Sequence, residues 1–304
     1  MITLANLVAR IPGGVAQGII WGLMALGVYI TFRVLKESDL TVDGSFATGG
    51  ATAVMLITSG VNPWLAMLIA FVVGILVGCI TGLIHTKLKI PAILSGILVQ
   101  FALYSINLHI MGMVANVSCN PTKNNVIITM RNIPKAILIG ALFAAVLIAI
   151  MYWYFGTEQG SAIRATGNNN HMALAQGINV NNMKVIGFAL GNGLVAMAGG
   201  LMAQYQGFSD INMGRGAIVI GLAAVIISEV LFGKLFRNFA LKLLAVAIGA
   251  VLYFIVIQIV LWLGLNTNLL KLLSALIVAV FLGIPFWKAN LTGKHPHKGG
   301  QPHA

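Results

Sequence analysis

The sequence has very little charge. Charged residues make up 8% of its 304 residues, and only six residues are acidic. A soluble domain carries roughly 25% charged residues, so this chain has too little polar surface to remain in water. Hydrophobic residues make up 59% of the chain, and its mean hydropathy is +0.96. The composition excludes an ordinary soluble protein and predicts a protein embedded in lipid.

Several chemical motifs are also missing. The two cysteines, Cys79 and Cys119, have no spacing that predicts a metal site or a disulfide framework. No Gly-rich phosphate loop ends in Lys-Ser or Lys-Thr, so we expect no ATP bound through that motif. His85, His109 and His171 are far apart in the sequence, which favours interfacial or loop positions over ligand positions. We therefore expect no enzyme activity, no metal and no cofactor held by this chain.

The basic residues indicate an orientation. The net charge of +12 comes from residues scattered singly between apolar runs, which is the pattern of membrane loops and not of a nucleic-acid surface. If residues 156–184 are cytoplasmic and the spans alternate, twelve Lys and Arg lie inside and six outside. This asymmetry predicts an outer N-terminus and an inner C-terminus. Residues 1–10 lack the features of a removable signal peptide.

Apolar runs of membrane length recur along the chain. A bilayer core needs about 20 apolar residues per helix. We predict an all-α polytopic membrane protein with about nine transmembrane helices, in one transmembrane domain over 1–288 that precedes a disordered cytoplasmic tail over 289–304. The predicted spans are 13–32, 39–59, 64–84, 92–113, 136–154, 185–206, 216–232, 240–263 and 268–286.

The second run is unusually polar and rich in glycine. Its polar residues are Asp39, Asp43, Ser45, Thr48 and Thr52. Interrupted or polar segments at membrane depth are tolerated where protein or a water-filled cavity surrounds them. We therefore predict that this run, full or interrupted, lines the route of a solute. The alternative is a Gly-rich helix that packs closely against its neighbours.

A later segment repeats this pattern. Residues 209–212 read Ser-Asp-Ile-Asn and echo Ser-Asp-Leu-Thr at 38–41, with small residues matching at the same offset on both sides. The alternating topology would place the two copies in opposite orientations, so we predict an inverted repeat with halves 13–113 and 185–287. Inverted repeats are typical of transporters, whose path lies at the repeat interface. Asp210, Asn212 and the nearby Gln204 join the predicted path. Anchoring of this region at the membrane surface by Tyr205 and Phe208 is an equal alternative.

Glu229 lies well inside an apolar run. A carboxylate at membrane depth suggests a functional role, and for Glu229 that role would be a proton relay. Lys234 and Arg237 follow within two turns, so we favour a structural ion pair with one of them or a carboxylate that snorkels toward the membrane surface.

A polar island at 160–184 separates the apolar spans. Residues 170–176 have helical composition and are followed by Gly177, which predicts a short helix. This helix would lie outside the bilayer, where a soluble partner could bind it. Ala173 and Leu174, with Met172, would offer an apolar face, and Arg164 would donate to a carboxylate or to helix-end carbonyls. Gly160, Gly167 and Gly177 would permit sharp turns. The alternative is a solvated loop without a partner.

These residues resemble a known family. Residues 160–168, with Arg-Ala-Thr-Gly-Asn at 164–168, and Gly-Ile-Asn-Val at 177–180 are similar to the coupling segment of ATP-binding-cassette importer permeases of the branched-chain amino acid and ribose group. Residues 39–45 resemble a stretch of the sugar members, from which the inserted Asp43-Gly44 departs. Residues 191–208 resemble a subgroup linked to uptake of tryptophan or related amino acids.

The resemblance implies the assembly and its site. The expected protein is a homodimeric permease in a bacterial cytoplasmic membrane, with cytoplasmic ATPases that bind ATP and Mg²⁺ and an extracytoplasmic solute-binding protein or lipoprotein. Two alternatives stay open, namely an ion-coupled secondary transporter with five-plus-five inverted-repeat helices and a scaffold subunit that transports nothing. The resemblance places ATPase coupling on Ser161, Arg164, Ala165, Gly167, Asn168, Met172, Ala173, Leu174 and Gly177.

Overall fold

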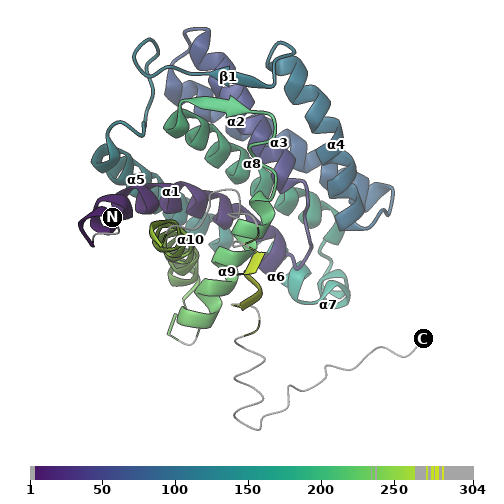
Figure 1. Cartoon of the computed structure of the whole chain (residues 1–304). Helices are drawn as coiled ribbons and strands as arrows, with labels where there is room; N and C mark the ends of the chain where they lie inside the picture. The colour runs from purple at the N-terminus through teal and green to yellow at the C-terminus, as the bar shows by residue number, and fades with distance from the viewer. Residues whose placement is uncertain are drawn as a thin grey trace.

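The computed structural model describes residues 4–233, 235–236 and 238–263, together with positions 272, 275–276, 278–280 and 283. The described part is predominantly helical, and two three-residue strands pair at one end (Figure 1). In chain order the elements are α1 (Leu4–Tyr29), the π-helical turn η1 (Ile30–Val34), α2 (Val42–Thr58), α3 (Pro63–Lys87), α4 (Ala92–Ile110), β1 (Asn116–Ser118), α5 (Ile133–Gly156), α6 (Glu158–Asn168), α7 (Asn170–Ala175), α8 (Val180–Gln206), β2 (Phe208–Asp210), α9 (Ala217–Phe232) and α10 (Phe239–Trp262).

Eight of the nine predicted spans coincide with these helices, and most of the ninth, 268–286, lies outside the described residues. Within the described part, six helices are long and apolar enough to cross a membrane, namely α1 with η1, α3, α4, α5, α8 and α10. α2 has 17 residues and α9 has 16, which is short of the roughly 20 that a full crossing needs. The count of nine crossing helices therefore stays a prediction.

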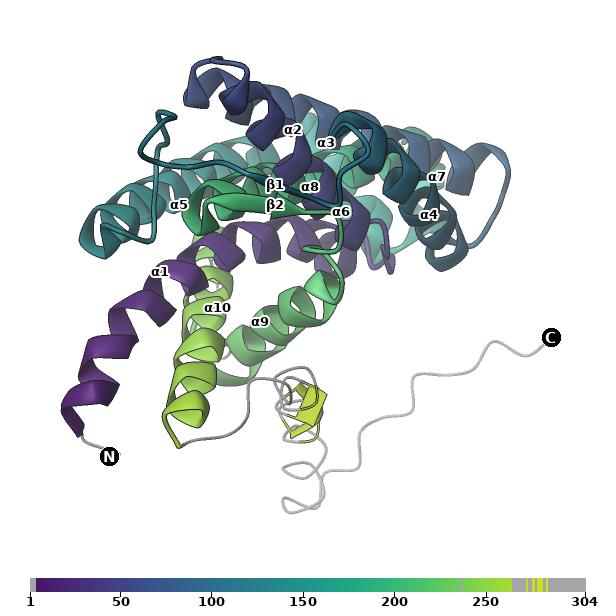
Figure 2. The same cartoon turned by 45° about the horizontal axis from the view of Figure 1, so that its top comes forward.

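α1 and α8 form the interior of the molecule. In their most apolar stretches, 78% of α1 and 83% of α8 is buried, against 28% of α4 and 22% of α5. α4 and α5 lie at opposite flanks in both views (Figures 1 and 2) and expose large apolar side chains such as Phe101 and Leu138. Helices that are apolar all round need a lipid or protein environment, so these flanks face lipid or another subunit.

α2 crosses α8 at close range through glycine. A β-carbon on Gly49 would lie 1.8 Å from the carbonyl oxygen of Ala196, and one on Gly199 would lie 2.0 Å from that of Phe46. No larger residue fits without moving a backbone. α2 is a continuous helix whose sides are almost fully buried, so the interruption considered for the second span is not within Val42–Thr58. The structure contains the close packing that the sequence offered as an alternative, and the solute-lining role stays a prediction.

The helical structure is interrupted instead before α2 and before α9. Residues 35–41 separate η1 from α2, and Lys36 has a φ of 58°. The 207–216 segment contains β2 and begins and ends with glycines at positive φ. In both segments an aspartate accepts a hydrogen bond from the backbone two residues later, Asp39 from Thr41 at 2.9 Å and Asp210 from Asn212 at 2.8 Å. The two echoed motifs thus share a local turn, while the inverted repeat as a whole is not established by this likeness.

The strands and the island helices lie at opposite ends. β1 and β2 pair antiparallel, with Asn116 opposite Asp210 and Ser118 opposite Phe208. α7 adjoins the start of α8 and β2 follows its end, about 40 Å away for a helix of 27 residues. The structure therefore joins segments 114–135 and 207–215, which the alternating topology places on the outer side, at one end and keeps the island at the other.

Candidate functional site

The polar island forms two helices where one was expected. The predicted helix is α7, and the unexpected one is α6. The hydroxyl of Thr157 accepts from the backbone of Gly160 at the start of α6, and the Asn169 side chain accepts from His171 and Met172 at 3.0 and 3.1 Å at the start of α7. These N-caps fix the boundary between the helices. Thr157 followed by Glu158 is the sequence signal that reveals α6.

The predicted turns at Gly160 and Gly167 are wrong, because both glycines are inside α6. A β-carbon on Gly167 would lie 1.8 Å from the carbonyl oxygen of Val34, so this glycine lets α6 pack against the end of η1. Of the three glycines predicted to form turns here, only Gly177 has the left-handed φ, 79°, that a turn requires. Ile178 then donates its N–H to the Ala173 carbonyl at 3.0 Å, which is a Schellman closure of α7.

The apolar face of α7 differs from the expected one. Met172 and Leu174 are 62% and 57% exposed, but Ala173 is only 2% exposed. Adjacent helical residues do not share a face, so the side of α7 that carries Ala173 packs on this chain. Ala173 is therefore not available to a partner, whereas Met172 and Leu174 are.

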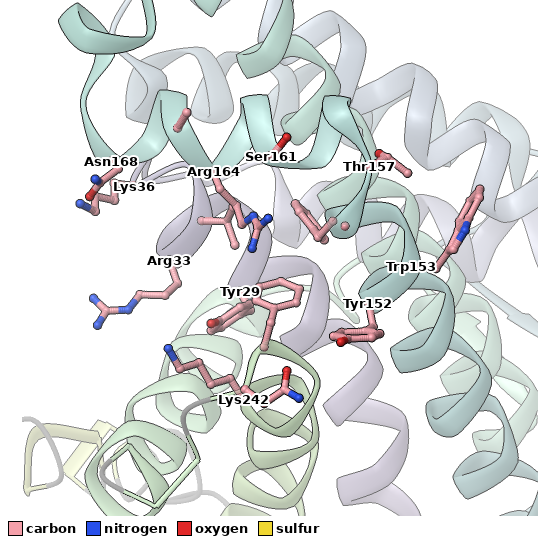
Figure 3. Close-up of a pocket in the computed structure, with 16 residues that line it drawn as sticks. Tyr29, Arg33, Lys36, Tyr152, Trp153, Thr157, Ser161, Arg164, Asn168 and Lys242 are labelled. Carbon is pink, nitrogen blue, oxygen red and sulfur yellow. The ribbon is translucent and has the colours of Figure 1, made fainter.

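The remaining coupling candidates face a cavity of about 1160 Å³ at the same end (Figure 3). Ser161, Arg164 and Asn168 recur at helical spacing on one side of α6, with Ala165 beside them. The guanidinium of Arg164 lies 5.8 Å from the centre of the Phe239 ring, a cation–π contact. Among the described residues no carboxylate is paired with Arg164, which lies against this ring and the open cavity. Its donation to a carboxylate or to helix-end carbonyls of the ATPase stays a prediction.

Two of the predicted path residues meet in a buried cluster around Asn192. Its side-chain N–H₂ donates to Asp39 at 2.6 Å, and its oxygen accepts from the hydroxyl of Ser45 at 2.6 Å. All three side chains are fully or almost fully buried. Sequence reasoning missed Asn192, although an amide between two glycines in a buried span was the available signal.

The other buried path residues have separate surroundings. The Thr48 hydroxyl donates to the Gly44 carbonyl of its own helix at 2.9 Å. The Gln204 oxygen accepts from the backbone of Ile127 at 3.0 Å and so fastens the 119–130 loop to α8. The hydroxyl of Thr52 and the amide nitrogen of Gln204 are buried without a partner among the described residues. Such groups are rare and mark places where water or a ligand can enter.

The other two acidic path residues, Asp43 and Asp210, accept hydrogen bonds from different parts of the chain. Asp43 accepts from the amides of Gly216 at 2.8 Å and Ile218 at 2.9 Å, so it caps α9. Asp210 belongs to β2 and accepts from the Asn116 side chain at 3.4 Å, whereas Asn212 is exposed. The eight predicted path residues therefore do not form one hydrogen-bonded cluster.

Glu229 forms an ion pair with Arg33, with 2.5 Å between the carboxylate oxygen and the guanidinium nitrogen. A structural pair was the favoured interpretation, but the predicted partners Lys234 and Arg237 lie outside the described residues. Both paired side chains are partly exposed, so the pair contributes little to stability.

A second ion cluster joins three separate segments. Glu37, before α2, accepts a hydrogen bond from Lys184 of α8, and the Nε2 atom of His85 lies 3.7 Å from the same Glu37 oxygen. Burial alone would raise the pKa of Glu37, but the bonds from His85 and Lys184 outweigh it and hold the pKa below its ordinary value. No group of three or more His, Cys, Asp or Glu side chains in the described part of the chain is placed to hold a metal ion.

Comparison with known proteins identifies the family. Residues 11–290 match the model of the branched-chain amino acid transport system permease component. The tyrosine transport system permease protein of Clostridioides difficile is 36% identical over 266 residues, which cover 88% of each chain. An uncharacterised protein of Rickettsia prowazekii is 33% identical over 88% of this chain and 94% of its own length.

More distant relatives extend the same group. The ribose import permease protein of Escherichia coli K12 is 25% identical over 67% of this chain and 64% of its own length. No solved structure matches the chain. The match covers nearly all described helices, and its members are membrane transport components and not enzymes. The chain is therefore a multi-pass protein of the bacterial plasma membrane and belongs to the branched-chain amino acid permease family of ATP-binding-cassette importers.

Proposed function

We propose that this permease imports an aromatic amino acid. The observation that carries the proposal is the 36% identity, over 88% of both chains, with a protein described as a tyrosine transport permease. The resemblance of residues 191–208 to a tryptophan-type subgroup supports the same class of solute. The working assembly would be a homodimer with two ATPases that bind ATP and Mg²⁺ and an extracytoplasmic solute-binding protein or lipoprotein.

Uptake by the reconstituted assembly tests the solute class. The permease, its ATPase and its binding protein are placed in liposomes, and ATP-dependent uptake of labelled tyrosine and tryptophan is compared with that of leucine and ribose. We expect saturable uptake of an aromatic amino acid, with little leucine or ribose. Uptake driven by an ion gradient without the ATPase would instead support the secondary-transporter alternative, for which Glu229, paired with Arg33, offers no free carboxylate.

The ATPase would bind α7. Six residues are too few for a helix that is stable alone in water, so α7 depends on the surfaces that it contacts. Ala173 provides the contact to this chain, and Met172 with Leu174 leaves an exposed apolar pair for a groove on the ATPase. α7 would therefore keep its coupling role, but its contact with the ATPase would be made by Met172 and Leu174 and not by Ala173.

A charge on the exposed pair tests this contact. Leu174→Glu should fold normally, since this side chain is 57% exposed, but should lose co-purification of the ATPase and solute-stimulated hydrolysis. Gln176→Glu adds the same charge at another exposed position near the end of α7 and serves as the control. Equal ATPase retention in both variants would reject α7 as the coupling contact.

We also propose that α2 and the 207–216 segment border the solute path. The Thr52 hydroxyl and the amide nitrogen of Gln204, both without a partner among the described residues, support polar lining of this region. Thr52→Val keeps the shape of the side chain and removes the hydroxyl, so it should keep or raise thermal stability while it lowers uptake. Thr58→Val is the control, because the Thr58 hydroxyl bonds only carbonyls of its own helix. Unchanged uptake in Thr52→Val would count against this lining.

A further inference from the structure

The cavity beside α6 carries an excess of positive charge that the proposed function does not use. Four basic side chains line it, Arg33 and Lys36 after α1, Arg164 on α6 and Lys242 on α10. Figure 3 shows them around one opening, with Arg164 extending from α6 toward Tyr29 and Lys242. Arg33 pairs with Glu229. Among the described residues, no carboxylate lies within salt-bridge distance of the other three.

The position of the cavity places these charges at a membrane surface. It is built from the end of α1 with η1, the end of α5 and the first turn of α10, all of which are candidate membrane spans. Trp153 and Tyr152 near the end of α5 line the other side of the cavity, and Trp153 is 71% exposed. Exposed Trp and Tyr at helix ends are typical of the headgroup level of a bilayer.

The size and chemistry of the cavity fit an amphiphile. Its volume of about 1160 Å³ exceeds the roughly 300–1,000 Å³ of ordinary small-molecule pockets. Guanidinium and ammonium groups bind phosphate oxygens, and Ser161 and Asn168 add neutral polar groups on the same wall. Aromatic side chains on the opposite wall suit the glycerol and upper acyl region of a lipid.

We infer that this cavity binds the phosphate headgroup of an anionic phospholipid, held by Arg164, Lys36 and Lys242 with the acyl chains beside Trp153. Basic pockets between membrane helices bind anionic lipid headgroups in this manner. The inference requires only the membrane location of the chain, so it can fail or hold independently of the solute and of the ATPase contact at α7.

Lipid retention by the purified full-length permease tests the inference. Phosphatidylglycerol or phosphatidylcholine is added to the protein in detergent, and bound lipid is measured by native mass spectrometry. The double variant Arg164→Gln/Lys242→Gln should bind phosphatidylglycerol at least about tenfold more weakly than the wild type, since each basic group near an anionic lipid contributes to binding. Phosphatidylcholine binding should not change.

Matched variants keep the result interpretable. Lys123→Gln/Lys135→Gln removes one exposed charge from the loop after β1 and one from the first turn of α5, and should leave phosphatidylglycerol binding unchanged. Arg164→Lys/Lys242→Arg keeps both charges and should retain binding. Lys242→Gln alone changes one exposed side chain and should weaken binding if the double variant does not fold.

Three results would overturn the inference. The first is equal phosphatidylglycerol retention by the cavity variants and the Lys123/Lys135 control. The second is displacement of the lipid by millimolar inorganic phosphate, which would identify a phosphate site. The third is loss of ATPase co-purification with unchanged lipid binding, which would assign the cations to the protein partner.

Discussion

The carboxylate of Asp43 in α2 accepts a hydrogen bond from the backbone N–H of Gly216, 173 residues later, at 2.8 Å. The same side chain accepts from Ile218 at 2.9 Å. One residue thus satisfies two of the free amides at the start of α9. The two helices, of 17 and 16 residues, meet at their N-terminal ends through this contact.

Removal of this cap should destabilise the fold. Asp43→Ala should lower the free energy of unfolding by about 1–2 kcal/mol, the upper range for loss of a helix cap. Asp43→Asn should cost less, because the amide keeps one acceptor oxygen. Thermal unfolding in detergent measures both, with Asp210→Asn at the β2 turn as the comparison. Identical stability of Asp43→Ala and the wild type would contradict the capping role.

The crossing of α2 and α8 should reject any side chain at Gly49. Gly49→Ala places a methyl group where only 1.8 Å separates it from the Ala196 carbonyl oxygen, so the helices must move apart. We expect little folded protein or a loss of about 2–3 kcal/mol. Gly13→Ala is the control, because its β-carbon would meet nothing within 4 Å and alanine favours a helix. Normal expression of both variants would show that the crossing tolerates a methyl group.

Asn192 should be essential for the buried polar cluster. Asn192→Leu has similar volume but leaves Asp39 and Ser45 without their partner. We expect a loss of about 3 kcal/mol or more, since each buried unpaired polar group costs about 1–3 kcal/mol. Asn181→Leu changes an exposed asparagine of the same helix and should be nearly neutral. The relative melting temperatures in detergent decide the prediction.

The ion cluster at Glu37 should make stability depend on acid pH. Its pKa is held below the ordinary value of 4.5, so the ionised form is the stabilising one. The stabilisation is present above the ordinary pKa and is lost as pH falls through the lower folded pKa. The advantage of the wild type over Glu37→Gln should therefore shrink in acid below pH 4.5. Glu158→Gln, an exposed change at the start of α6, controls for general charge effects, and a pH-independent difference would refute the assignment.

Much of the fold was predictable because a bilayer imposes simple requirements. Apolar runs of about 20 residues identify spans regardless of their partners. α7 was predictable for a related reason, since residues 170–176 have helical composition within a polar segment and end at Gly177. α6 was not predicted because Gly160 and Gly167 were interpreted as turn residues. Glycine also lets helices approach closely, and that is its role here.

Pairwise contacts were not predictable from local pattern. Glu229 was assigned to neighbours in sequence, but its partner Arg33 comes from the other end of the chain. Ala173 was placed on an exposed face, but the side of α7 that packs on this chain is set by tertiary contacts. The role of Asn192 was not predictable from its own segment, because Ser45 reaches it only where α2 crosses α8. Each of these contacts depends on how helices cross, which composition does not encode.

The late position of α8 has a consequence for biosynthesis. α8 supplies the most buried part of the interior and carries Asn192, which follows Asp39 by 153 residues. While the ribosome makes the first seven α-helices, Asp39 and Ser45 have no Asn192 to bond and the glycine face of α2 has no helix to cross. The insertion machinery must shelter this first half until α8 emerges, and a nascent chain stopped before α8 becomes a substrate for membrane proteases.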